Sequence, residues 1–292
     1  MGTPEPDSRA CNIIETVRAD TQSGAAQLAT RALTLVRQWL AAGGVSTDAL
    51  EQLLTDLAKA RPSMVPLANA MERVRQGLVG SQNGASTAEQ ALPVVDSVLE
   101  QIASANRRVA EFATTRVSEQ ARIFTHSRSS QVLALFRLLV QQGRNFSVIC
   151  TQSSPGNEGF TLARELDELG VRVTVITDAQ MGLFVPKADL VLCGCDTWLA
   201  DGHFLNKAGS YPLALLARAE AKPLWVLADS FKDSTAPHDE VTLEEMAANQ
   251  LGAPAGQHIT VRNLYFEPVP VQLISGRISE QGVFSFPAEP GP

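Results

Sequence analysis

The sequence predicts an α/β protein with a helical N-terminal domain, residues 1–120, followed by a Rossmann-like, mainly parallel sheet domain, residues 121–292. The first reason is a change of period. Up to about residue 120 the apolar residues recur with helical spacing, and beyond it short apolar runs alternate with helical patterns. The second reason is that such alternation is typical of parallel βαβ units with right-handed crossovers. A chain of 292 residues with 45% hydrophobic content is long enough for two such domains.

The N-terminal domain is expected to consist of successive helices separated by turns. Gly43-Gly44 ends the first helical segment, because glycine adopts the left-handed conformation that closes a helix. Ser46 or Thr47 can cap the next helix through a side-chain oxygen, and Pro62 lies where a further helix can begin. The helical segments run from Ile13 to Ala42, from about Ser46 onward, from about Pro62 onward, and from about Thr87 to Glu119.

The C-terminal domain is expected to contain strands that are apolar on both faces, as the buried strands of a parallel sheet are. Each is short and ends in a polar turn, and the carboxyl ends of parallel strands share one edge of the sheet. Polar turns gathered at one edge favour a shared ligand site. The predicted strands are Ile123-Phe124, Phe146 to Cys150, Val171 to Ile176, Leu190 to Cys193 and Leu224 to Ala228.

Composition excludes several classes of function. The formal net charge is −7 and the isoelectric point is ≈ 5.2, which gives no basis for direct binding to nucleic acid or to an anionic membrane surface. No apolar run reaches the roughly eighteen residues of a membrane span, and the N-terminus lacks the features of a signal peptide, so a cytoplasmic protein is expected. The four cysteines form no CxxC pair and the four histidines are scattered. Neither a metal nor another cofactor is therefore expected.

The stretch from Asp189 to Tyr211 carries the polar groups on which the functional prediction depends. Gly194 follows a strand and lets the backbone pass closely beside another segment, and Asp196 comes at the strand's carboxyl end, where ligands bind in open parallel sheets. Asn206 and Lys207 follow in a loop, ahead of a helical pattern. A carboxylate, an amide, an ammonium and a free helix N-terminus suit a phosphorylated, hydroxyl-rich small molecule. The alternative is an ordinary surface loop with a capping aspartate and a solvated lysine.

The first βα turn, Thr125 to Gln131, offers a second group of candidates. Ser127, Ser129 and Ser130 lie at a helix start, where free N–H groups and the helix dipole favour an anion. Arg128 could add a bidentate contact to that anion. Alternatively, the hydroxyls act only as helix caps. Because the turn has no GxGxxG fingerprint, a dinucleotide is not expected.

Several motifs occur in the same order as in a known superfamily. They are THSRSS, TDAQMG, KADLVLCGCDTWLADGHFLNKAGSYPLALLA and WVLADSFK, with VRADTQSGAAQLATRAL and RPSMVPLANAM before them and FEPVPVQLISGRISEQGVF after them. This set resembles the superfamily of ribose-1,5-bisphosphate isomerase, methylthioribose-1-phosphate isomerase and the alpha, beta and delta subunits of translation initiation factor 2B. The resemblance covers nearly the whole chain. It implies a helical domain, a Rossmann-like domain, and dimers or higher homo-oligomers.

The resemblance also implies roles for particular residues. Asp196 matches the catalytic aspartate of the isomerases. Asn206 and Lys207 match residues that hold the hydroxyl and phosphate groups of the substrate. Arg61 matches an arginine near a phosphate, and Gly24-Ala25 matches a pair whose backbone approaches the other phosphate.

Two departures from the isomerase pattern bear on the function. The isomerases carry a catalytic cysteine where this chain has Ser127, and usually an arginine where it has Ser23. A hydroxyl is far less acidic than a thiol, so Ser127 cannot simply take over the proton transfers of a cysteine. The initiation-factor subunits also lack that cysteine. Cys195 is no substitute, because neighbouring side chains of a strand point to opposite faces and Asp196 is expected to face the ligand.

Two function classes follow. The first is an aldose–ketose isomerase of a phosphorylated pentose, with Asp196 as general acid and base and with Arg61, Arg128 and Lys207 on phosphate. The second is a non-catalytic regulatory or assembly subunit that binds a sugar phosphate or a nucleotide. The apolar segment from Val269 to Ile278 favours a homodimer built through the C-terminal domain. The alternative is that this segment only covers the sheet of its own subunit.

Overall fold

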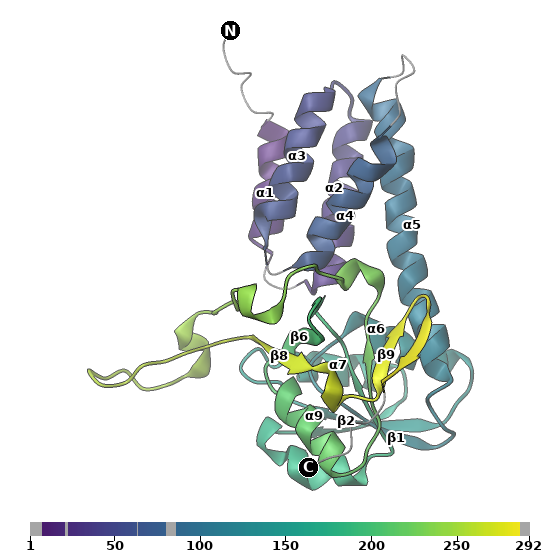
Figure 1. Ribbon diagram of the computed structural model, residues 1–292, viewed down its shortest axis with the longest axis vertical. Helices are drawn as coiled ribbons and strands as arrows, with labels where there is room; N and C mark the ends of the chain where they lie inside the picture. The colour runs from purple at the N-terminus through teal and green to yellow at the C-terminus, as the bar shows by residue number, and fades with distance from the viewer. Residues whose placement is uncertain (1–7, 21–22, 63, 80–85, 287–292) are drawn as a thin grey trace. The chain divides into compact units, whose positions relative to one another are not determined.

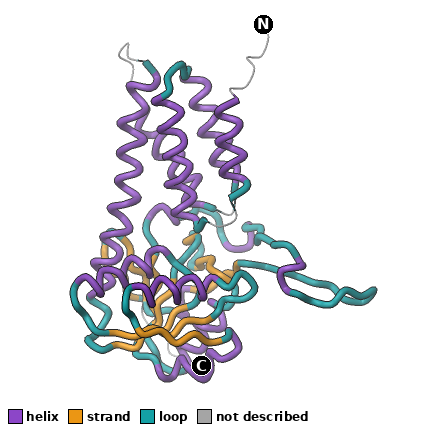
Figure 2. The backbone as a smooth tube through the Cα atoms, turned by 180° about the vertical axis from the view of Figure 1, so that it is seen from behind, coloured by secondary structure: helices purple, strands orange, loops and turns teal. Residues whose placement is uncertain are grey.

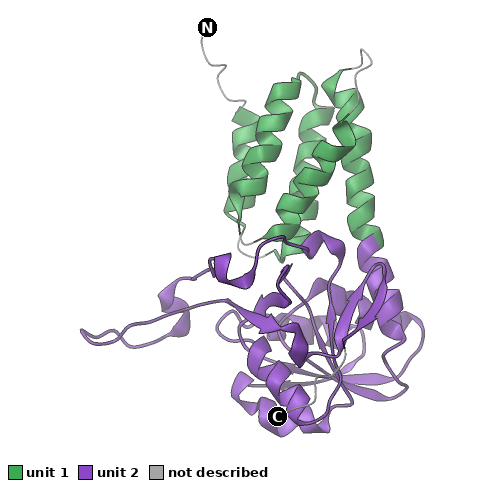
Figure 3. Cartoon of the chain, in the orientation of Figure 1, with its two compact units in different colours: residues 1–104 green, residues 105–292 purple. Residues whose placement is uncertain are grey.

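The computed structural model describes residues 8–20, 23–62, 64–79 and 86–286. The chain forms two compact units, residues 1–104 and 105–292 (Figure 3). The boundary lies inside the long helix α5, Thr87–Thr114, whereas the change of hydrophobic period in the sequence comes near residue 120. The last turns of α5 therefore belong to unit 2, where Val109 and Ala113 enter its core.

Unit 1 is helical, as the period of its apolar residues predicts. Its helices pack through fully buried aliphatic side chains such as Leu28, Leu57 and Met71, and α4 packs against both α2 and α3. Ser46 caps α3, since its Oγ accepts from the Ala49 N–H at 3.2 Å. The helices are α1 Ser8–Arg18, α2 Ala25–Ala41, α3 Thr47–Ala60, α4 Val65–Leu78 and the first part of α5.

Helix boundaries in unit 1 differ from the prediction in places. The segment from Ile13 to Ala42 is not one helix but parts of α1 and α2, because Asp20 bonds the turn between them. The proline at the start of α4 is Pro66 and not Pro62. Helix α5 ends at Thr114, five residues early, and contains Pro93. Apolar spacing does not reveal breaks as short as these.

Unit 2 is built on a sheet whose order is β10-β9-β7-β4-β1-β2-β3 (Figure 1). The pairings are parallel from β3 through to β9, and β10 joins β9 antiparallel. This confirms the Rossmann-like, mainly parallel fold. The strands are β1 Ala121–Thr125, β2 Phe146–Thr151, β3 Arg172–Ile176, β4 Leu190–Cys193, β7 Leu224–Leu227, β9 Gly276–Ser279 and β10 Gly282–Ser285.

The sheet separates two apolar cores because successive side chains of a strand point to opposite faces. Ile123 packs with Phe136 of α6 and Leu162 of α7, while its neighbour Phe124 packs with Leu213 of α9. In Figure 2 helices flank the strands accordingly. The helices of unit 2 are α6 Ser130–Gln141, α7 Glu158–Glu168, α8 Met181–Phe184 and α9 Ser210–Ala219. Short 3-10 turns occupy Asp178–Gln180, Val185–Lys187, Ser230–Lys232, His238–Glu240, Ala248–Leu251 and Val271–Leu273.

A small antiparallel sheet has the order β5-β6-β8; β5 and β6 lie between β4 and α9 in the chain, and β8 follows the long connection after β7. Its strands are β5 Thr197–Trp198, β6 His203–Lys207 and β8 Phe266–Pro270. Asn206 and Lys207 therefore lie on a strand rather than in the open loop that the sequence suggested. The Trp198 and Phe204 rings stack at 5.8 Å across the hairpin. Because each of these strands is short, their alternation is too brief to be recognised in the sequence.

The C-terminal segment from Val269 to Ile278 packs within unit 2. Val269 and Ile274 belong to one core and Ile278 to the other, and each is at most 5% exposed. The segment forms the end of β8, a 3-10 turn and the start of β9. Its apolar character is thus explained by the sheet of its own subunit.

The long connection from β7 to β8 leaves the sheet. We call residues 247–260 the arm; they are exposed throughout. An antiparallel bridge between Glu245 and Leu264 closes its base. Figures 1 and 2 show the arm reaching away from the rest of unit 2. In the described part of the chain, no helix is both long and apolar enough to cross a membrane.

Candidate functional site

The strand order of unit 2 reverses between β1 and β4. From β1 the chain adds β2 and β3 on one side, and β4, β7 and β9 on the other. In open α/β sheets the crevice outside the carboxyl ends of the strands at such a switch point is where ligands bind. Ser127 follows β1 and Asp196 follows β4, so these candidates come from the strands on either side of the reversal.

Gly194 lets the two turns meet. A Cβ atom at this position would lie 2.5 Å from both the Cβ and the Oγ of Ser129, which is closer than real carbon contacts come. The predicted close approach is therefore confirmed, and its partner is the turn after β1. Ser129 also caps α6, since its Oγ accepts from the Val132 N–H at 3.4 Å. Ser130 is the first residue of that helix.

Ser127 has a left-handed backbone, with φ 63°. For a residue with a Cβ this conformation costs about 1–2 kcal/mol, and such residues concentrate at functional sites. The Ser127 N–H donates to Ser153 Oγ at 2.8 Å, and Ser153 itself has φ 62°. The two turns thus hold each other in an uncommon conformation.

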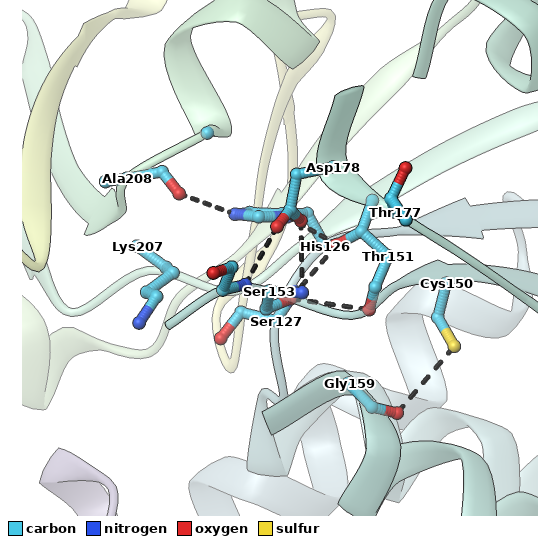
Figure 4. Close-up of polar contacts among 12 residues, drawn as sticks. His126, Ser127, Cys150, Thr151, Ser153, Gly159, Thr177, Asp178, Lys207 and Ala208 are labelled. Carbon is cyan, nitrogen blue, oxygen red and sulfur yellow. Dashed lines mark hydrogen bonds and ion pairs between the residues drawn. The ribbon is translucent and has the colours of Figure 1, made fainter. Parts of the chain in front are cut away.

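A directed chain of hydrogen bonds continues from Ser127 (Figure 4). Because the Ala208 carbonyl can only accept, His126 donates to it through Nε2 at 2.9 Å. His126 Nδ1 then accepts from Thr151 Oγ1 at 2.7 Å, and Thr151 Oγ1 accepts from Ser153 Oγ at 3.0 Å. These directions hold for the neutral imidazole with its proton on Nε2, the form that burial favours.

Burial lowers the pKa of His126, although the Ala208 carbonyl and Asp178 act in the opposite direction. Asp178 Oδ1 lies 3.7 Å from the imidazole Nδ1. Its two oxygens accept the backbone N–H groups of Ser153 at 3.0 Å and Ser154 at 2.8 Å. His126 and Asp178 therefore position the turns around Ser127.

Asp196 is partly exposed at the end of β4, and its backbone N–H donates to the Leu205 carbonyl at 2.9 Å. Burial raises the pKa of its carboxyl to about 6, against the lowering effect of Lys232 and Lys207. Glu158 adds to the rise. A carboxyl that titrates near neutral pH can act as a general acid or base.

Lys207 already has an anionic partner. Its Nζ donates to Glu158 Oε1 at 3.0 Å and lies 3.4 Å from the centre of the Tyr265 ring, and its side chain is only 4% exposed. Glu158 Oε2 is buried and has no hydrogen-bond partner among the described residues. The Lys207 ammonium, which was expected to bind phosphate, is thus paired with the Glu158 carboxylate. One oxygen of that carboxylate, Oε2, accepts no hydrogen bond from the described residues.

The N-terminus of α9 is not free for a ligand, contrary to expectation. Glu267 Oε1 accepts the backbone N–H groups of Gly209 at 2.7 Å and Tyr211 at 2.8 Å. Asn206 Nδ2 donates to Ser210 Oγ at 2.7 Å, and that hydroxyl donates to the Lys207 carbonyl. A carboxylate from β8 therefore satisfies the donors that an anion would have used.

Arg128 makes a bidentate ion pair with Glu165 of α7, at 2.7 and 2.8 Å. The hydrogen bond that Arg128 donates to Glu165 raises the pKa of the guanidinium. A phosphate contact by Arg128 remains a prediction, and it requires competition with Glu165.

The candidates of unit 1 gather around Asp20. The Asp20 carboxylate accepts hydrogen bonds from the backbone N–H and the hydroxyl of Ser23, at 2.9 and 2.8 Å, and forms an ion pair with Arg31. Arg61 donates to the backbone carbonyl of Asp20. Gly24 and Ala25 begin α2 directly after this turn. Within unit 1, Asp20 therefore fixes the turn at the N-terminus of α2 and lies beside Arg61.

A further polar group after β7 has no role in the sequence-based prediction. Asp229 accepts from Gln131 Nε2 at 2.6 Å, and burial raises the pKa of its carboxyl. Lys232 is buried and donates to the Cys195 carbonyl. Charged residues that end an apolar strand were a signal that could have identified them. Cys195 itself is buried, and burial raises the pKa of its thiol to about 12, which agrees with its exclusion as a catalytic group.

A Rossmann-like sheet with polar turns on both sides of its switch point is an arrangement in which α/β proteins often bind small molecules. Comparison with known proteins identifies the family of this chain, because the model of the initiation factor 2 subunit family matches residues 17–286. The chain belongs to this family. A putative translation initiation factor eIF-2B subunit 2-like protein of Pyrococcus abyssi is 35% identical over 237 residues, which is 81% of each chain.

Both branches of the superfamily are represented among the relatives. The ribose 1,5-bisphosphate isomerase of Archaeoglobus fulgidus is 31% identical over 234 residues, or 77% of this chain and 73% of that protein. The crystal structure of the Pyrococcus horikoshii translation initiation factor eIF-2B has a TM-score of 0.82 at 29% identity, covering 96% of this chain and 98% of that one. The predicted resemblance is confirmed, and it spans initiation-factor-like proteins as well as isomerases.

Proposed function

We propose that this protein is a non-catalytic, regulatory or assembly member of its family that binds a phosphorylated sugar or a nucleotide at the β1–β4 switch point. The observation that carries the proposal is that a serine, Ser127, stands where the isomerases have their catalytic cysteine. The Ser127 hydroxyl is a poor acid, and its backbone N–H is used to hold Ser153. In this proposal Asp196, Asn206 and Lys207 serve as the binding groups.

The charges around Lys207 restrict the ligand further. A phosphate that approaches the Lys207 ammonium also meets the Glu158 carboxylate, because the two side chains are paired at 3.0 Å. The unpartnered Glu158 oxygen, in contrast, is suited to accept a hydrogen bond from a ligand hydroxyl. A ligand that offers several hydroxyl groups as well as a phosphate, such as a sugar phosphate or a nucleotide, supplies both contacts.

Binding and turnover are tested together. We expect ribose 1,5-bisphosphate, methylthioribose 1-phosphate or a nucleotide to raise the melting temperature. At a ligand concentration a hundred times the dissociation constant, the free energy of unfolding should rise by about 2.7 kcal/mol. NMR of the same samples should show no conversion of either sugar. Lys207→Glu should weaken binding by about 1.5–3 kcal/mol, since it removes a charge-assisted contact. Undiminished binding by this variant would place the ligand elsewhere.

The second candidate function is an aldose–ketose isomerase that uses Asp196 alone. The pKa of about 6 favours it, because a group of this pKa exchanges protons readily near neutral pH. In that case wild type converts the sugar phosphate, Asp196→Asn abolishes conversion while binding is kept, and Ser127→Cys raises the rate. Conversion that survives Asp196→Asn would exclude this mechanism.

We also propose that the protein forms a homo-oligomer through the arm. The arm carries exposed aliphatic side chains, Leu251 at 41% and Ile259 at 47%, and Leu264 at its base is 39% exposed. A segment that leaves its own sheet and still presents apolar groups is suited to pack on a second copy.

A further inference from the structure

A cluster of metal-ligand side chains lies away from the switch-point turns, at the turn of the β5–β6 hairpin. It consists of Asp201, His203 and His238. Asp201 and His203 belong to the hairpin, and His238 begins the 3-10 turn His238–Glu240 beyond β7. One ligand atom of each residue lies within 4.8 Å of the others. Two of the four histidines, which are far apart in the sequence, therefore lie side by side in the folded chain.

Hydrogen bonds alone leave part of this cluster unexplained. His238 Nδ1 lies 2.5 Å from Asp201 Oδ2, which also accepts the His238 backbone N–H at 2.9 Å. His203 Nδ1 lies 3.2 Å from Asp201 Oδ1, yet this buried nitrogen makes no hydrogen bond within the described residues. The two imidazole rings face each other at 4.0 Å, with 33° between their planes. A buried nitrogen that makes no hydrogen bond, beside a second imidazole and a carboxylate, is a set of ligand atoms that suits a cation.

We propose that Asp201, His203 and His238 bind a divalent ion of the zinc class. Zinc takes imidazole nitrogen and carboxylate oxygen at about 2.0–2.2 Å, and three protein ligands leave one position for water. Ligand atoms that already lie within 4.8 Å of one another reach a common ion with small rotations of their side chains. Magnesium and calcium prefer oxygen ligands alone, so the two imidazoles select against them.

The ion would join two segments that already touch. The Ser234 N–H donates to the Trp198 carbonyl at 2.8 Å, and the Ala200 N–H donates to the Ala236 carbonyl at 3.2 Å. A metal bridge next to these bonds fixes the β5–β6 hairpin to the segment that follows β7. Since β6 ends in Asn206 and Lys207, the ion would also restrain the strand that carries these two candidate ligand contacts.

Zinc titration of the metal-stripped full-length protein, in competition with a colorimetric chelator, tests the site. We expect about one ion per chain. His238→Ala and Asp201→Asn should each weaken binding about tenfold or more, since even residues that only orient a ligand contribute that much. His238 is exposed, so its loss should leave the fold intact. His258→Ala, in the exposed arm, is the matched control and should bind as wild type does.

Cobalt substitution gives an independent readout. We expect an absorption spectrum with ligand-field bands and without thiolate charge transfer, because nitrogen and oxygen atoms supply the ligands. The spectrum should be unchanged by Cys11→Ser, which removes the exposed thiol, and lost in His238→Ala. Three results would each overturn the proposal: no zinc binding by wild type, zinc binding by the Asp201 and His238 variants that is as tight as that of wild type, or a thiolate charge-transfer band in the cobalt spectrum.

Discussion

Asp196 is the residue whose surroundings matter most for the chemistry of the site. Its side chain combines partial burial with two nearby lysines, and burial dominates, so its pKa rises to about 6 from 3.8. The folded protein therefore binds this proton more tightly than the unfolded chain does. The stabilisation from the proton is complete below about pH 3.8 and is lost as the pH rises through about 6.

Asp196→Asn is therefore expected to stabilise the protein at higher pH. The amide cannot ionise, so at about pH 8 the free energy of unfolding should exceed that of wild type by on the order of 1–2 kcal/mol, after discounting for partial exposure. At about pH 4 the difference should nearly vanish. Urea unfolding at both values measures it, with Asp167→Asn on the exposed side of α7 as control. A gain of the same size at both values would contradict the assigned pKa.

Glu158 pairs with Lys207 at 3.0 Å, so we expect it to limit how strongly an anion binds there. Glu158→Gln removes the carboxylate that neutralises Lys207, so we expect a phosphorylated ligand to bind about tenfold more tightly, or about 1.4 kcal/mol. Calorimetric titration measures the change, and Glu168→Gln, exposed near the end of the same helix, is the control. Weaker binding by Glu158→Gln would show instead that the hydrogen bond from a ligand hydroxyl to the carboxylate outweighs its competition for Lys207.

At the scale of elements, the sequence was sufficient where one signal extends over several residues. Strands β1, β2, β3, β4 and β7 were predicted because apolar runs flanked by polar turns identify buried parallel strands. The partners of the site residues could not be predicted, because they are distant in the chain. Glu158 is 49 residues from Lys207, and Glu267 is 58 residues from Gly209. Both pairings depend on where β6, β8 and α7 meet, which no local pattern specifies.

At the switch point, the turn after β4 contacts the turn after β1 through Gly194 and Ser129. Gly194→Ala should destabilise the protein by roughly 1–3 kcal/mol, because the added Cβ overlaps Ser129 and forces the turns apart. Gly182→Ala is the control, since nothing lies within 4 Å of its added Cβ. Ser129→Gly should recover most of the loss in the double variant, as expected for residues in direct contact. An additive double variant would mean that the destabilisation has another origin.

For the whole molecule, the open question is how copies associate. In the segment from Val269 to Ile278, which the sequence suggested as an interface, Val269, Ile274 and Ile278 are buried in the cores of unit 2, and other residues are partly exposed. The arm is one segment that extends away from the cores of its own subunit (Figure 1), and its apolar side chains Leu251 and Ile259 are exposed. Apolar residues on a segment remote from the core contribute little to the free energy of folding. These side chains can therefore be buried only when the arm packs against another molecule.

Leu251→Ser and Ile259→Ser are expected to shift the protein toward the monomer while leaving its melting temperature nearly unchanged, because both side chains are exposed in the single subunit. Leu183→Ser on α8 is the control, since this side chain is 63% exposed and lies outside the arm. Sedimentation at micromolar concentration should show a dimer or larger species for wild type and for Leu183→Ser. A monomeric wild type would exclude association at that concentration, and an oligomer unaffected by the arm variants would move the interface to another surface of the chain.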